Sequence, residues 1–157
     1  MLHKLRIGLS VAVIAALGFV LGTAPTYAAN YYDGKSPVGT GCNKSGVVKS
    51  TKYFNSHNLR GTIQLMYSTK CKTAWAYVKL SKPYPSKYGY VNAVIHRNND
   101  KKSYSCYSSG GNGRIIRYQS TCYSAMVYDY KPNTSYAEGT YSPGEADVYS
   151  LGRTSSY

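Results

Sequence analysis

The fold is decided by residues 61–80, which read GTIQLMYSTKCKTAWAYVKL. In the first half of this stretch, apolar Ile63, Leu65 and Tyr67 alternate with polar residues, and the second half alternates in the same way. A period of two is typical of β-strands that bury one face. The polar residues 68–73 join the halves, so the stretch predicts a β-hairpin with a cysteine in its turn.

Further strands are predicted on both sides of this hairpin, and no stretch after residue 30 has sustained helical spacing. The sequence therefore predicts an all-β domain, a small disulfide-stapled β-barrel or sandwich of about seven to nine short antiparallel strands. The other predicted strands cover residues 47–53, 90–97, 101–107, 114–119, 122–130, 136–141 and 146–151.

The amino terminus has the features of a secretory signal peptide. Basic residues precede an apolar run over residues 7–21, and small residues follow up to Ala28. We expect residues 1–28 to be a cleaved signal peptide and residues 29–157 to be a single secreted β-domain. The alternative is a retained membrane anchor, because the apolar run is fairly long.

Four cysteines follow the predicted cleavage site, namely Cys42, Cys71, Cys106 and Cys122. In an exported chain they predict two disulfides, for which three pairings are possible. We favour Cys42–Cys71 and Cys106–Cys122, because the second pair flanks a predicted hairpin and the first ties the amino-terminal loops to the central one. Each disulfide would contribute about 3 kcal/mol. The spacing does not resemble a zinc site, so no metal or cofactor is predicted.

The chain is strongly basic, with 19 lysines and arginines against 6 acids. Without Lys4 and Arg6 the net charge is 17 minus 6, or +11, and fifteen of the basic residues lie in residues 35–117. Such an excess predicts attraction to polyanions. The alternative is a solvated surface that only keeps a secreted protein soluble.

Tyrosine occurs 19 times, and most of these side chains are expected to pack on half-buried strands. Around the predicted hairpin ends, however, tyrosines alternate with basic residues. If these ends gather at one rim, the cations would hold phosphates, and the tyrosines would enter a lipid interface or stack on sugars or bases. The predicted ligand-binding cations are Lys79, Lys82, Lys87, Arg97, Lys101, Lys102, Arg114 and Arg117, and their aromatic neighbours are Tyr84, Tyr88, Tyr104 and Tyr118.

Motifs for catalysis are weak, and no catalytic residue is predicted. His57 and His96 could act as acid and base in RNA cleavage, but nothing in their spacing brings them together or near an orienting acid. The glycine-rich residues 108–113 lack the ending of a phosphate-binding P-loop and predict a hairpin turn instead.

Three groups of residues resemble an uncharacterised family of secreted domains typified by the YjfA protein of Gram-positive bacilli. The resemblance covers essentially the whole mature chain and implies a secreted, disulfide-stapled domain without an enzymatic motif to carry over. The groups are Asp33-Gly34 and Pro37 before Gly41-Cys42, then Leu65-x-Tyr67-Ser68-x-x-Cys71-x-x-Ala74-Trp75-Ala76, and Cys122-Tyr123-x-x-Met126-Val127-x-Asp129.

We expect a secreted, non-enzymatic module that binds an anionic surface or polymer. Phospholipid head groups with peripheral membrane contact, teichoic acid or another phosphorylated ligand fit the charge, and nucleic acid is less favoured because of export. One alternative is a secreted ribonuclease-like hydrolase that uses His57 and His96. The other is a toxin-like factor that acts on a protein partner.

Overall fold

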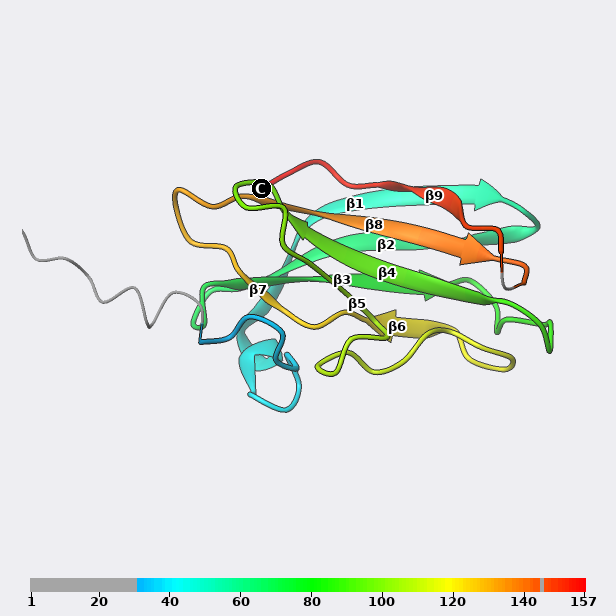
Figure 1. Ribbon diagram of the computed structural model, residues 1–157, viewed down its shortest axis with the longest axis horizontal. Coiled ribbons are helices and arrows are strands. Elements are labelled where there is room, and N and C mark those ends of the chain that lie inside the picture. Colours follow the sequence, from blue (N-terminus) through cyan, green and yellow to red (C-terminus); the bar gives the residue numbers. More distant parts are fainter. Residues whose placement is uncertain (1–30, 145) are drawn as a thin grey trace, which may run out of the picture.

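The computed structural model describes residues 31–144 and 146–157, so the predicted signal peptide lies outside the described residues. The described chain is almost entirely β (Figure 1). Its elements are the 3-10 helix η1 (Cys42–Ser45) and strands β1 (Gly46–Ser56), β2 (Leu59–Ser68), β3 (Thr73–Leu80), β4 (Tyr90–Arg97), β5 (Ser103–Ser105), β6 (Thr121–Tyr123), β7 (Val127–Tyr128), β8 (Ser135–Ser142) and β9 (Tyr149–Arg153).

The strands form two antiparallel sheets. The first has the order β1-β2-β3-β6, with β7 also paired to β3, and the second has the order β5-β4-β8-β9. The predicted central hairpin is confirmed as β2 and β3, where Ile63 lies opposite Val78 and Leu65 opposite Ala76. Alternation therefore directs these apolar side chains to a common face.

The sandwich alternative is confirmed and the closed barrel is wrong. Within the described residues, no strand ladder joins one sheet to the other. Side chains of β1 contact the backbone of β9 and of the residues after it: the Ser155 amide donates to Ser50 Oγ at 3.2 Å, and Gly152 lies against the Lys52 side chain. These contacts shield the two edges without closing the sheet, which is another way to protect edge strands.

One predicted strand, residues 114–119, is wrong. Only Ile115 makes a β-bridge, to Val91. The chain then turns, because the Gln119 amide donates to the Ile116 carbonyl oxygen at 3.0 Å and Tyr118 has a φ of 70°. A non-glycine residue in the left-handed region interrupts a strand.

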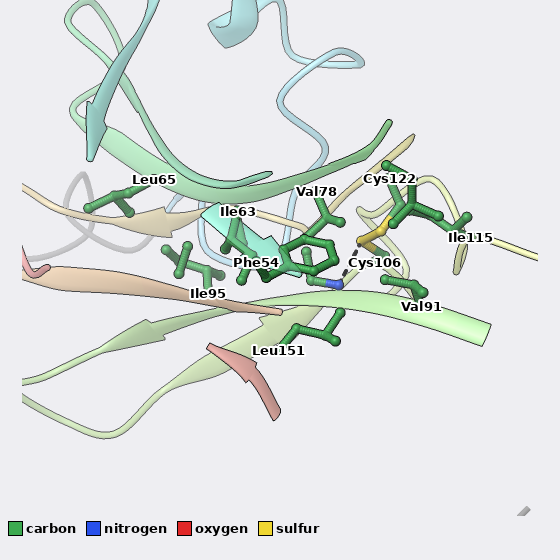
Figure 2. Packing of buried hydrophobic residues seen from close by; sticks show 14 of the residues in the cluster. Phe54, Ile63, Leu65, Val78, Val91, Ile95, Cys106, Ile115, Cys122 and Leu151 are labelled. Atoms are coloured by element: carbon green, nitrogen blue, oxygen red, sulfur yellow. Dashed lines mark hydrogen bonds between the residues drawn. A yellow bond between two sulfur atoms is a disulfide. The ribbon is translucent and has the colours of Figure 1, made fainter. Parts of the chain in front are cut away.

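The main core lies between the sheets (Figure 2). Apolar side chains from both sheets interdigitate there, and Ile115 joins them from outside the strands. The labelled members include Phe54, Ile63, Leu65 and Val78 from the first sheet and Val91, Ile95 and Leu151 from the second.

A second, smaller core lies apart from the first and contains the single tryptophan. Trp75 follows Ala74 in β3 and therefore points to the opposite face, where it packs with Cys42 and Met126. Gly46 is needed here, because a Cβ at this position would lie 2.8 Å from the Trp75 ring. The amino-terminal segment is thus part of the packed domain.

Both favoured disulfides are confirmed. Cys42–Cys71 ties η1 to the β2–β3 turn, as expected. Cys106–Cys122 does not close a hairpin, because β5 belongs to the second sheet and β6 to the first. This second disulfide therefore joins the two sheets covalently, inside the main core (Figure 2).

Candidate functional site

The predicted ligand-binding residues do not gather at one rim. Lys87 lies just before β4, whereas Lys101 and Lys102 lie just after it. The seven residue steps of β4 correspond to about 23 Å at 3.3 Å per residue. Consecutive turns of antiparallel strands lie at opposite ends, so the expectation of a single rim is wrong and the predicted site divides into two.

We call one of these ends the β3–β4 end. It consists of the β1–β2 and β8–β9 turns, the loop 81–89 and the segment 114–120, which lie together at the right of Figure 1. Backbone hydrogen bonds join the last two: the Tyr84 amide donates to the Gln119 carbonyl oxygen at 2.8 Å, and the Tyr118 amide donates to that of Tyr84 at 2.9 Å. The predicted site residues of loop 81–89 and those of segment 114–120 therefore lie close together.

Cations at the β3–β4 end lack a described counter-ion. Of the 17 lysines and arginines in the described residues (19 minus Lys4 and Arg6), only Arg97 and Lys102 form ion pairs with a described acid. Positive charge at this end is therefore exposed to solvent. The cations concerned are Arg60, Lys79, Lys82, Lys87 and Arg117, all of them exposed.

A groove of about 670 Å³ runs beside the β1–β2 turn and the start of loop 81–89. Arg60 and Lys82 line it, together with Pro83 and Pro85. Its other lining residues are Asn55, Asn58, Leu59, Leu80 and Ser81. The groove thus brings two cations to an otherwise uncharged hollow.

A second hollow, of about 370 Å³, adjoins this groove. Tyr53 and Lys79 line it, and Arg60 lines both hollows. Arg60 Nε donates to Asn55 Oδ1 at 3.0 Å, which orients the guanidinium. Arg60 and Tyr53 were not predicted as site residues; the available signal was the position of Arg60 two residues after the turn that the structure forms at His57-Asn58.

Exposed apolar and aromatic side chains accompany the cations. Tyr88, Tyr118 and Ile116 are 66%, 73% and 52% exposed. The Lys87 ammonium lies 4.8 Å from the Tyr88 ring centroid, and the Arg117 guanidinium carbon lies 4.6 Å from that of Tyr118. The β3–β4 end therefore exposes aromatic and aliphatic side chains as well as cations.

Tyr84 does not belong to this exposed surface. It is buried, and its hydroxyl donates to the Tyr88 carbonyl oxygen at 3.0 Å. Burial raises the pKa of Tyr84 to about 12. The prediction that Tyr84 is an exposed aromatic site residue is therefore wrong. Tyr84 is a packing residue that supports loop 81–89.

The side chains of Arg114 and Tyr104 also pack against other residues of the domain. The Arg114 guanidinium carbon lies 4.0 and 4.3 Å from the ring centroids of Tyr90 and Tyr107. Tyr104 packs on Gly34, at 3.3 Å from where a Cβ would stand. Neither residue is therefore placed with the exposed cations of the β3–β4 end.

Arg97, at the opposite end, is a structural residue and not an exposed ligand-binding cation. Its guanidinium is 3% exposed and donates to both oxygens of Asp33, at 3.0 and 2.9 Å, and of Asp100, at 2.9 and 2.6 Å. Lys102 Nζ joins Asp33 at 2.9 Å, whereas Lys101 is exposed. Arg97 holds the pKa of Asp100 far below its usual range. We call Asp33, Arg97, Asp100 and Lys102 the Arg97 clasp.

The two histidines are not brought together. His57 packs against Tyr141, with ring centroids 5.4 Å apart, and His96 stacks on Tyr136 at 4.7 Å. The two tyrosines are five residues apart on β8, which corresponds to about 17 Å. His96 Nε2 also lies 3.2 Å from Glu138, so the arrangement does not supply an acid and a base around one phosphate.

In the part of the chain that the structure describes, no three His, Cys, Asp or Glu side chains are placed to hold a metal ion. Among the same residues, no helix has the length and hydropathy to cross a membrane.

Comparison with known proteins gives a consistent family assignment. Residues 30–138 match the family described as "Protein of unknown function (DUF2690)". The chain is 43% identical over 150 residues to the uncharacterized protein YjfA of Bacillus subtilis (strain 168), a match that covers 92% of this chain and 94% of that protein. No solved structure gives a significant match. The resemblance noted from the sequence is confirmed: the chain belongs to the DUF2690 family.

Proposed function

We propose that this protein is an exported, non-enzymatic module that binds a phosphate-bearing surface or polymer through the β3–β4 end. The observation that carries the proposal is the group of five exposed cations without a described counter-ion at the β3–β4 end, two of which, Arg60 and Lys82, line its groove. Arginine and lysine bind phosphate oxygens through charge-assisted hydrogen bonds. The two disulfides support export, because such bonds persist in oxidising compartments.

The exposed Tyr88, Tyr118 and Ile116 favour a membrane or envelope surface over a soluble small anion. Tyrosine rings occupy the interface between lipid head groups and acyl chains, and an aliphatic side chain beside them can enter that interface. Phospholipid head groups and phosphate polymers such as teichoic acid share the phosphate chemistry that the cations would recognise.

Charge reversal at the β3–β4 end should strongly weaken binding to anionic vesicles. We expect the triple variant Lys82→Glu, Lys87→Glu and Arg117→Glu to weaken co-sedimentation with vesicles containing phosphatidylglycerol by on the order of 100-fold, at about 1 kcal/mol per cation. Wild-type binding should fall with added salt, and neutral phosphatidylcholine vesicles should not retain the protein.

The matched control reverses three exposed lysines elsewhere, in the variant Lys44→Glu, Lys70→Glu and Lys101→Glu. Both triple variants change the net charge by the same amount. If both lose binding equally, the attraction is a property of the total charge and the proposed site is refuted.

Removing the exposed apolar groups should show whether the ligand is a membrane or a soluble polymer. We expect Ile116→Ser with Tyr118→Ser to reduce vesicle binding about ten-fold, because less apolar surface enters the lipid interface. Binding to soluble polyphosphate, measured by calorimetry, should stay within a factor of two. Equal losses with both ligands would argue against interfacial insertion.

A further inference from the structure

A separate pocket lies at the end opposite the β3–β4 end. It has a volume of about 530 Å³, and the rings of Tyr67, Tyr130 and Tyr157 line it. Tyr67 comes from β2, whereas Tyr130 follows β7. Tyr157 is held in place because its backbone exchanges hydrogen bonds with Ser135, at 3.0 and 3.1 Å. Three segments far apart in sequence thus form one aromatic pocket.

A buried carboxyl group also lines this pocket. Asp129 is 4% exposed, and its Oδ1 accepts a hydrogen bond from Ser135 Oγ at 2.9 Å. Its Oδ2 is buried and has no hydrogen-bond partner among the described residues. A buried carboxylate oxygen without a donor is costly, and either a proton or a cationic donor relieves the cost. Burial accordingly raises the pKa of Asp129 to about 7.

The tyrosine rings already attract ammonium groups of the protein itself. Lys49 Nζ lies 4.1 Å from the Tyr157 ring centroid, and Lys72 Nζ lies 5.7 Å from that of Tyr130. Neither of these lysines lines the pocket; the lysine that does is Lys131, whose side chain is exposed. Tyr130 and Tyr157 both line the pocket, so a ligand cation within it can interact with their rings in the same way.

We propose that this pocket binds a primary ammonium group of a small or polymer-linked ligand, with the Asp129 carboxylate as its counter-ion and hydrogen-bond acceptor and the tyrosine rings around its alkyl part. A primary ammonium supplies both an N–H donor for the Asp129 carboxylate and the charge that offsets its burial. A neutral sugar would supply only the donor. This site is independent of the phosphate-binding end.

The affinity for ammonium should rise with pH as Asp129 ionises. The charged and titratable groups around Asp129 are Tyr67, Tyr130, Tyr157, Arg97, Lys72 and Lys131. Since the pKa of Asp129 is about 7 and alkylammonium ions stay protonated, affinity should increase roughly ten-fold between pH 6 and pH 8. A purely aromatic site would show no such change.

The test is a titration of the whole protein with n-butylammonium chloride, followed by calorimetry and by NMR shifts of the pocket residues. Butan-1-ol provides a neutral compound of the same length, and methyl α-glucoside represents a neutral sugar. We expect saturable binding of the ammonium, at least ten-fold tighter than that of either neutral compound. Tighter binding of the alcohol or the sugar, or no ammonium binding up to high millimolar concentration, would overturn the proposal.

Variants complete the test. Asp129→Asn should weaken ammonium binding at least ten-fold and remove its pH dependence, whereas Asp147→Asn, at an exposed acid, should leave both unchanged. Tyr157→Leu, at a half-exposed terminal ring, should weaken binding about five-fold without unfolding the domain. The Lys82, Lys87 and Arg117 triple variant should still bind butylammonium, so failure of one site is distinguishable from failure of the other.

Discussion

Arg97→Met is expected to lower the free energy of unfolding by about 3–5 kcal/mol, because it breaks a buried ion pair and leaves its partner charged. The Asp33 side chain is 6% exposed and accepts hydrogen bonds from Arg97, Lys102 Nζ and the Tyr128 amide. Without the guanidinium, the Asp33 carboxylate keeps only Lys102, whose side chain is partly exposed, as a counter-ion among the described residues. The loss should lower the melting temperature by about 10–20 °C, measured by calorimetry.

The matched control is Arg153→Met, which makes the same chemical change at an exposed arginine outside the described ion pairs. It should change stability by less than about 0.5 kcal/mol. Adding Asp33→Asn to Arg97→Met should recover part of the loss, since the buried charge is then removed. A single variant within about 1 kcal/mol of wild type would contradict the role of the Arg97 clasp.

Part of this stabilisation is lost in acid. The pKa of Asp100 is lowered from its ordinary value of 3.8, chiefly by the hydrogen bonds from Arg97. The native state therefore favours the carboxylate, and this contribution is present above about pH 4 and disappears as the pH falls through the lowered pKa.

Asp129 should give the opposite pH dependence, and this is the second large effect that we expect. Its pKa is raised from 3.8 to about 7 by burial, so between these values the native state holds a proton that the unfolded state has released. Stability should therefore fall as the pH rises, by about 2–3 kcal/mol between pH 5 and pH 8, and level off above pH 8.

Asp129→Asn should remove this fall, because an amide does not ionise. Urea unfolding at pH 5, 6, 7 and 8 would measure it, with Asp147→Asn as the control whose curve should run parallel to that of the wild type. An Asp129→Asn curve that also runs parallel to the wild type would show that the carboxyl group is not perturbed in the folded state.

Much of the fold follows from local sequence patterns. The alternation of Ile63, Leu65 and Tyr67 predicts β2, and the same rule locates β4 and β8. The assignment of strands to sheets could not be predicted in this way, because a period of two does not say which neighbour a strand pairs with. Cys106 and Cys122 were paired correctly, yet β5, which ends just before Cys106, and β6, which contains Cys122, lie in different sheets.

The candidate site was predictable only where its residues are close in sequence. Lys82, Lys87 and Tyr88 lie in one loop, and their placement follows from the loop itself. Arg97 looked like one more surface cation, because its partner Asp33 lies 64 residues away and sequence spacing does not reveal that contact. The pocket around Asp129 was missed for the same reason, since its tyrosines come from three distant segments.

The position of Trp75 makes it an intrinsic fluorescent probe of one part of the domain. It is the only indole of the chain, it is 4% exposed, and Cys42 and Gly46 cover it. Its fluorescence emission therefore senses whether the amino-terminal segment is docked, whereas circular dichroism follows the sheets as a whole. Comparing the two signals during denaturation would distinguish release of that segment from unfolding of the sandwich, without any added label.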